Sequence, residues 1–257
     1  MSLDVIDLRD FYHRPLGQIA RRVLRAKIRA RFSDVAGLRV LGCGYAAPFL
    51  GPFREEAERV LAFMPAEQGV LDWRSSRGVA STLIDCEMWP LPDEAIDRIL
   101  LVHALESAAE PREVLREAWR CLAPGGRLLA VVANRRAPWS AFENNPFGHG
   151  RPYSSMQLRN LLRETQFNPV EWSEALLFPP IERAILLRSA IALERLGGRF
   201  WAPFAGVHIV EAVKQVHRPA RVRRRASRVK RVRRLARRLV PEVGRPAPGV
   251  GAPAKYE

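Results

Sequence analysis

The chain has 257 residues, of which 47% are hydrophobic and 27% charged, an ordinary composition for a globular protein. These values exclude a chain that is disordered throughout or embedded in a membrane, and the length suits one sizeable α/β domain with an appendage. The formal net charge is +15, but residues 218–238 hold 12 basic residues and no acid, which leaves +3 for the rest. The excess charge, and any anionic partner that it implies, therefore belongs to that segment.

The three cysteines, Cys43, Cys86 and Cys121, are widely spaced, form no C-x-x-C pair and have no histidine grouping beside them. This pattern favours a reducing cytoplasm and predicts no metal site. Residues 1–17 carry acids where a signal peptide needs bases, and no stretch approaches the length of a membrane span. We therefore expect a cytoplasmic protein without a transmembrane segment.

The N-terminal region is basic and amphipathic. Between residues 8 and 32, apolar side chains recur at helical spacing among Arg and Lys. The spacing predicts one helix, with the Pro15-Leu16-Gly17 stretch near its true start. Residues 1–33 are expected to form a helical cap on the domain that follows.

Strands and helices then alternate. Apolar runs predict strands at residues 38–42, 59–63, 82–84, 98–103 and 127–133. Helices or helix-length spacers are expected around residues 48–58, 73–79 and 112–121. Near-continuous apolar strands of this kind are typical of a parallel sheet covered by helices on both faces. Residues 34–217 are therefore predicted to form one α/β domain.

Residues 134–153 are rich in Pro, Gly and Asn and predict a long loop. The loop gathers aromatic and ionisable side chains, which are Trp139, Phe142, Phe147, His149, Arg151 and Tyr153. It is either an ordinary surface loop or a lid over a site at the strand ends.

The last part of the domain predicts two more strands and two helices. The first helix is predicted at 154–164, with Ser154 or Ser155 as its N-cap, and a strand follows at 170–177. A helical insertion is predicted over 180–198, and its helix at 181–196 ends at Gly197-Gly198. The last strand is predicted at 206–214. The two strands would complete a sheet of seven.

Two stretches carry specific motifs. The first, LRVLGCGYAAPFL at residues 38–50, is an apolar run that turns at Gly-Cys-Gly toward a helix, as nucleotide-binding sites do. The second, residues 83–136, holds Asp85 after a strand, then Trp-Pro-Leu, Ile-Asp, Leu-Glu and finally Leu-Ala-Pro-Gly-Gly. Together, in this order and spacing, they resemble the class I S-adenosylmethionine-dependent methyltransferases, in particular the type 11 group.

The resemblance implies a three-layer Rossmann-like α/β fold with a seven-stranded, mostly parallel sheet, and S-adenosylmethionine as cofactor. The positions that it assigns to the cofactor are Gly42, Cys43, Gly44, Tyr45, Met64, Asp85, Cys86 and His103. In that assignment the glycines approach methionine and ribose, Asp85 accepts from the adenine amino group, and the strand end near His103 faces the sulfonium. The implied reaction is methyl transfer to an unidentified acceptor, expected to be a small molecule.

The sequence departs from the family pattern at three slots. Where the family has an acid before the first glycine, this sequence has Val40, and where the family has the last glycine, it has Ala46. Where the family has a ribose-binding acid after the second strand, this sequence has Met64. Glu67 or Asp72 could replace that acid only if the register or the loop is shifted. A catalytically inactive binding or regulatory protein of the same fold therefore stays open, as does a nucleic-acid-associated methyltransferase.

Few side chains suit proton transfer. His103 and His149 are candidate bases because histidine titrates near neutral pH, although a single histidine is often structural. Glu106 is interpreted as an acid at a helix start or as a base. Cys43 and Cys86 are expected to be small buried apolar residues.

The segment at 218–240 combines an apolar seam with a broad cationic face. Such a helix suits an anionic membrane surface, or the phosphates of nucleic acid, and a solvated basic extension is the alternative. Residues 241–257 are rich in Pro and Gly and are expected to be disordered.

Overall fold

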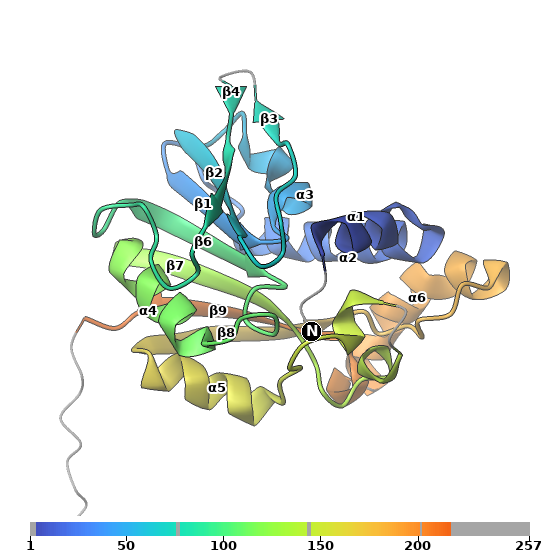
Figure 1. Cartoon of the computed structure of the whole chain (residues 1–257). Coiled ribbons are helices and arrows are strands. Elements are labelled where there is room, and N and C mark those ends of the chain that lie inside the picture. Colours follow the sequence, from blue (N-terminus) through green and yellow to red (C-terminus); the bar gives the residue numbers. More distant parts are fainter. Residues whose placement is uncertain (1–3, 76–77, 143–144, 201, 217–257) are drawn as a thin grey trace, which may run out of the picture. The chain divides into compact units, whose positions relative to one another are not determined.

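The computed structural model describes residues 4–75, 78–142, 145–200 and 202–216 (Figure 1). The basic segment at 218–240 and the tail at 241–257 lie outside the described residues. In the part that is described, no helix is long and apolar enough to cross a membrane.

The domain is built on a seven-stranded sheet in the order β5-β2-β1-β6-β7-β9-β8. The strands of this sheet are β1 (Arg39–Gly44), β2 (Arg59–Pro65), β5 (Ser81–Ile84), β6 (Ile96–Val102), β7 (Leu122–Ala133), β8 (Phe167–Ala175) and β9 (Val207–Lys214). Neighbouring strands are parallel except that β9 runs antiparallel to both β7 and β8. The predicted seven-stranded, mostly parallel sheet is confirmed.

The strand order reverses between β1 and β6. The chain moves outward from β1 through β2 to β5 and then returns to add β6 on the other side of β1. Ligands of open α/β sheets bind outside the carboxyl ends of the strands at such a point. The topology therefore places the expected site next to the Gly-Cys-Gly turn.

Helices cover both faces of the sheet, which gives three layers (Figure 1). One face packs against four helices, which are α1 (Val5–His13), α2 (Pro15–Arg31), α3 (Ala47–Leu50) and α6 (Ala184–Phe200). The other face packs against α4 (Pro111–Cys121) and α5 (Ser155–Glu164). Adjacent strand residues serve opposite faces, as Leu100 and Leu101 do. This burial on both sides explains why the strands are nearly continuous apolar runs.

The N-terminal region forms two helices, α1 (Val5–His13) and α2 (Pro15–Arg31), so the prediction of one helix is wrong. Arg14 between them has extended backbone angles (φ −69°, ψ 157°). A residue before proline avoids helical angles, and Pro15 begins α2 at a position where no backbone N–H is needed. Pro15 therefore both begins α2, as predicted, and ends α1.

Two other helix predictions differ from the structure. Instead of a helix at 73–79, the short strands β3 (Arg74–Ser75) and β4 (Gly78–Val79) pair antiparallel. Gly and Val are poor helix formers, and seven residues are too few to compensate. After β1 the helix α3 (Ala47–Leu50) is only one turn long and continues as a 3-10 turn at Gly51–Phe53.

The helix α6 (Ala184–Phe200) runs through Gly197-Gly198, so the predicted end at these glycines is wrong. Glycine weakens a helix by about 1 kcal/mol but ends it only when it takes a left-handed conformation. The helix α5 begins where predicted, because the Ser154 hydroxyl accepts from the Gln157 N–H and the Gln157 side chain accepts from the Ser154 N–H.

The segment 134–153 is packed against the domain. It contains 3-10 helices at Pro138–Ala141 and Pro146–Gly148, and its Trp139 and Phe147 are fully buried. The Trp139 indole donates to the Phe178 carbonyl (2.7 Å). The aromatic residues of this loop therefore belong in part to the core.

Candidate functional site

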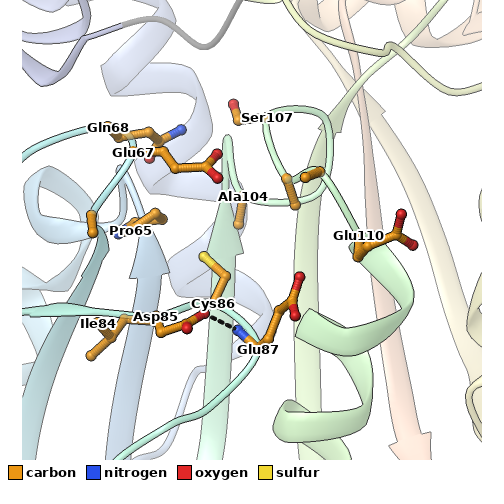
Figure 2. A pocket seen from close by; sticks show the side chains of 13 residues that line it. Pro65, Glu67, Gln68, Ile84, Asp85, Cys86, Glu87, Ala104, Ser107 and Glu110 are labelled. Carbon is orange, nitrogen blue, oxygen red and sulfur yellow. Dashed lines mark hydrogen bonds between the residues drawn. The ribbon is translucent and has the colours of Figure 1, made fainter.

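A cavity of about 270 Å³ lies at the carboxyl ends of β2, β5 and β6 (Figure 2). Its lining includes four carboxylates and, among the described residues, neither Lys nor Arg. We call it the acidic cavity, and its lining residues are Pro65, Ala66, Glu67, Gln68, Ile84, Asp85, Cys86, Glu87, Ala104, Ser107, Ala108, Ala109 and Glu110. A site of this charge favours a cation or a ligand rich in hydrogen-bond donors.

Asp85 follows β5 and lies in a tight turn. Its Oδ1 accepts from the backbone N–H of Glu87 (2.8 Å), and the backbone of Asp85 pairs with Met88. No described residue hydrogen-bonds its Oδ2, so this oxygen is free for a ligand donor. The structure thus places Asp85 and Cys86 together at the cavity.

Met64 does not line the acidic cavity. It is buried in the core, and its sulfur accepts from the Leu71 N–H (3.1 Å). Pro65 ends β2, and the chain then turns so that Glu67 points into the cavity (Figure 2). Asp72 is not among the lining residues. Glu67, and not Met64 or Asp72, therefore places a carboxylate in the cavity near the end of β2.

The Gly-Cys-Gly turn brings β1 close to β6. Gly44 has φ +79°, and a Cβ there would overlap the carbonyl oxygen of Val102. The next residue, Tyr45, donates its N–H to that same oxygen (2.8 Å). These contacts require glycine at position 44, but Gly42, Cys43, Gly44 and Tyr45 lie outside the lining of the acidic cavity.

Cys43 and Cys86 link the turn to the cavity. Interaction with the Cys86 thiol, together with burial, raises the pKa of Cys43, and interaction with the Cys43 thiol lowers the pKa of Cys86. Both thiols are free, and Cys86 is only partly buried. Cys86 therefore presents the more acidic thiol to the cavity.

A buried polar cluster lies at the end of β6. The Tyr12 hydroxyl is 2.9 Å from His103 Nε2, and His103 Nδ1 is 3.2 Å from Glu106 Oε1. All three residues are almost completely buried. We call this the Tyr12–His103–Glu106 cluster.

Both the backbone and the side chain of His103 are fixed by contacts with other residues. It has φ +52°, an uncommon angle for a residue other than glycine, and its carbonyl oxygen accepts from the Gln68 side chain (2.9 Å). The ring of Phe147 lies 5.0 Å from the imidazole. Backbone strain of this kind persists only where the surroundings enforce it, and it is concentrated at functional sites.

The hydrogen bonds of the cluster indicate which atoms donate and which accept. An ionised Glu106 can only accept, so it fixes the proton of neutral His103 on Nδ1 and leaves Nε2 to accept from Tyr12. Burial raises the pKa of Tyr12 well above its usual value, with Tyr45 and Glu106 adding to the shift, so the phenol stays protonated. Glu106 Oε2 has no hydrogen-bond partner among the described residues. His103 Nε2 therefore faces the Tyr12 hydroxyl, and Glu106 faces Nδ1 on the other side of the ring.

The second histidine candidate is placed elsewhere. His149 follows the 3-10 helix at Pro146–Gly148 and does not line the acidic cavity. Sequence reasoning did not connect Tyr12 or Gln68 with the site, because they lie 91 and 35 residues from His103. No local pattern signals such contacts.

Comparison with known sequences identifies the domain. A family model described as a methyltransferase domain, of type 11, matches residues 40–130. A ubiquinone/menaquinone biosynthesis C-methyltransferase, UbiE, of Acidiphilium cryptum is 30% identical over 108 residues. This match covers 40% of the chain and 41% of that relative, so it spans less than half of the relative's length.

Solved structures share the fold. A SAM-dependent methyltransferase of Thermotoga maritima aligns with a TM-score of 0.60 and 18% identity, covering 82% of this chain and 96% of that one. The cyclase SpnF aligns with a TM-score of 0.54 and 23% identity, covering 78% and 84%. The family model matches residues 40–130, and the seven-stranded topology and these neighbours share the fold, so together they support a class I S-adenosylmethionine-dependent methyltransferase.

Proposed function

We propose that the chain transfers a methyl group from S-adenosylmethionine to a small-molecule acceptor, with His103 as the base. The observation that carries this proposal is the Tyr12–His103–Glu106 cluster, which lies at the carboxyl end of β6 beside the acidic cavity. Methyl transfer needs an aligned acceptor and, for an O–H, N–H or acidic C–H acceptor, a group that takes its proton.

The acidic cavity suits the adenosine half of the cofactor. Adenosine presents two ribose hydroxyls and an exocyclic amino group, which are donors that Glu67 and Asp85 can accept. Both carboxylates line one cavity at the strand ends, and a charge-assisted hydrogen bond contributes about 1.5–3 kcal/mol. Glu67 would hold the ribose and Asp85 the adenine.

The methionine half requires movement of α1. The Tyr12 ring stacks on Tyr45 of the glycine turn (5.3 Å between ring centroids, 11° between planes) and hydrogen-bonds His103. Tyr12 thus covers the place where the family resemblance puts the sulfonium. We propose that α1 shifts when the cofactor binds and that Tyr12 then leaves His103.

When bound, the cofactor supplies an electrophilic methyl group. The chain supplies the base and the carboxylate that stabilises the protonated base. Once Tyr12 has moved, His103 Nε2 takes the acceptor's proton, and the Glu106 carboxylate stabilises the resulting imidazolium. The positive charge on His103 then resides next to Glu106, its hydrogen-bonded neighbour.

A binding or regulatory protein is the second candidate function. The closed Tyr12–His103 contact favours it, because an inactive descendant would have no need to open. The neighbour SpnF is a cyclase, and one fold can host different chemistry. Cofactor binding without methyl transfer would distinguish this candidate.

The experiment is label transfer from methyl-labelled S-adenosylmethionine into a cell extract that has been separated into small molecules, protein and RNA. We expect label in the small-molecule fraction and its loss with His103→Asn, since Asn tolerates a positive φ. Label in RNA would favour the nucleic-acid alternative. Cofactor binding with no transfer into any fraction would favour the regulatory one.

The basic segment at 218–240 is a separate proposal, and it rests on the sequence alone. We propose that it docks the protein on a polyanionic surface, either anionic lipid or nucleic acid. A peptide of this segment should become helical on anionic vesicles if lipid is the partner, as circular dichroism would report. A peptide that ignores both vesicles and duplex DNA at physiological salt would contradict docking. Cytoplasmic location likewise stays a prediction.

A further inference from the structure

A second hollow, of about 770 Å³, adjoins the acidic cavity and shares Ala109 and Glu110 with it. It is more open, and arginine and amide side chains line it. We call it the arginine groove, and its lining includes Arg112, Arg135, Arg151, Tyr153 and Glu164. The acidic cavity and the arginine groove thus differ in charge.

Two of the arginines are brought together by backbone pairing. Tyr153 donates its N–H to the Ala133 carbonyl (2.9 Å), and Arg135 donates its N–H to the Tyr153 carbonyl (3.1 Å). The segment that carries Arg151 therefore runs beside the end of β7 and the residues after it, which include Arg135. The two arginines come from segments that hydrogen-bond each other.

Arg135 and Arg151 have no ion pair and no side-chain hydrogen bond with any described residue, and both are exposed. Arg112 differs, because its guanidinium binds the Glu164 carboxylate (2.8 Å). Two guanidiniums are thus free to bind an anion. Arg binds carboxylate and phosphate in a planar, two-bonded geometry that Lys cannot match.

The position of Arg151 is fixed relative to the Tyr12–His103–Glu106 cluster. Its backbone N–H donates to the carbonyl of Glu106 (2.8 Å). Gly150 before it has φ +72° and lies so close that a Cβ would overlap the same carbonyl oxygen. Arg151 is therefore attached to the residue whose carboxylate contacts His103.

Tyr153 lines the groove and contacts the segment that follows β6. Its hydroxyl donates to the Leu105 carbonyl (3.4 Å), and burial raises its pKa to about 12. The hydrogen bonds of Tyr153 to Leu105 and of Arg151 to Glu106 therefore join the groove to the segment that carries the proposed base and its partner.

We infer that the arginine groove is the acceptor site and that Arg135 and Arg151 select a small acceptor bearing a carboxylate or a phosphate. The inference rests on the proposed function, since it assumes that the cofactor occupies the acidic cavity. A molecule held by its anionic end at these arginines would extend past Tyr153 toward His103. Arg135 and Arg151 are then residues that determine specificity.

The test uses two minimal probes, benzoate for a carboxylate and phenyl phosphate for a phosphate, titrated into the full-length protein saturated with S-adenosylhomocysteine. We expect saturable binding of at least one probe. Arg135→Gln and Arg151→Gln should each weaken it about tenfold or more, and Arg151→Lys should restore it only in part. The stronger probe identifies the acceptor's anionic group.

Arg22→Gln is the matched control, because Arg22 is an exposed arginine of α2 that does not line the groove. It should leave probe binding unchanged. Failure of both probes to bind, or equal weakening by all three Gln variants, would overturn the inference. S-adenosylhomocysteine affinity, measured in the same variants, should stay constant and shows that they are folded. Probe binding in a protein that does not bind S-adenosylhomocysteine would instead contradict the proposed function and leave the anion site in place.

Discussion

His103 Nδ1 lies 3.2 Å from Glu106 Oε1, and both side chains are almost completely excluded from solvent. Burying a carboxylate is costly unless it is paired, and here the imidazole and the Ala133 N–H (3.4 Å) are its partners. A pair that is maintained against this cost, at a residue with φ +52°, is more consistent with chemistry than with packing.

Loss of the proposed base should reduce methyl transfer. His103→Asn and Glu106→Gln are each expected to lower the rate of label transfer by about 10²- to 10⁴-fold, the range typical of general base catalysis. S-adenosylhomocysteine affinity should change by no more than a few fold. Transfer at an undiminished rate in either variant would assign the cluster a structural role.

Tyr12→Phe should make the cofactor bind more tightly. The substitution removes the hydroxyl that joins α1 to His103, and a hydrogen bond of this kind contributes roughly 0.5–1.5 kcal/mol to the closed state. Affinity for S-adenosylhomocysteine should therefore rise by about two- to tenfold. Calorimetry measures this, and an unchanged or lower affinity would argue against movement of Tyr12.

Substituting Gly44 and Gly37 by alanine distinguishes the cost of steric overlap from the cost of a positive φ. Both have positive φ, but a Cβ at Gly44 would overlap the Val102 carbonyl, whereas one at Gly37 meets nothing within 4 Å. Gly37→Ala should cost about 1–2 kcal/mol of unfolding free energy, and Gly44→Ala more than about 3 kcal/mol. Urea unfolding of the two variants tests this. Equal losses would mean that β1 and β6 are not in such close contact.

His208 should make the protein less stable in acid. Burial lowers its pKa to about 4, and neither ring nitrogen has a hydrogen-bond partner among the described residues. Because the folded pKa lies below the unfolded value of about 6.5, the unfolded chain binds the proton first as the pH falls. Stability should therefore decrease between about pH 6.5 and 4, by roughly 3 kcal/mol in total.

The matched variant for that prediction is His208→Phe, which keeps a ring beside Trp172 (5.3 Å between ring centroids). From pH 7.5 to pH 5 the unfolding free energy of the parent should fall relative to that of the variant, because only the parent carries the buried His208. A constant difference across this range would show that His208 does not titrate as expected.

The sheet could be predicted from the sequence, because strands that are buried on both faces are continuous apolar segments in the sequence. It could also single out Asp85 and Gly44, since a turn at a strand end is a local feature. Tyr12 and Glu67 are different cases. Tyr12 meets His103 across 91 residues, and Glu67 reaches the cavity only because Pro65 and the following loop redirect the chain. Such contacts depend on tertiary packing, which no window of sequence contains.

The helix errors have the same origin. Pro15 was interpreted correctly as a start signal, but its effect on Arg14 divides the region into two helices. Gly197 and Gly198 are weak helix formers, yet a helix of 17 residues continues through them. Local propensity is of the order of 1 kcal/mol per residue, and packing can exceed it.

The most direct test of the account is calorimetric titration of the full-length protein with S-adenosylhomocysteine, together with Glu67→Gln, Asp85→Asn and the control Glu55→Gln. Glu55 is exposed and does not line the acidic cavity. We predict saturable binding by the parent and the control, and weakening of about tenfold or more in each cavity variant. No binding at millimolar ligand, or the same affinity in all four proteins, would contradict the assignment of the acidic cavity to the cofactor.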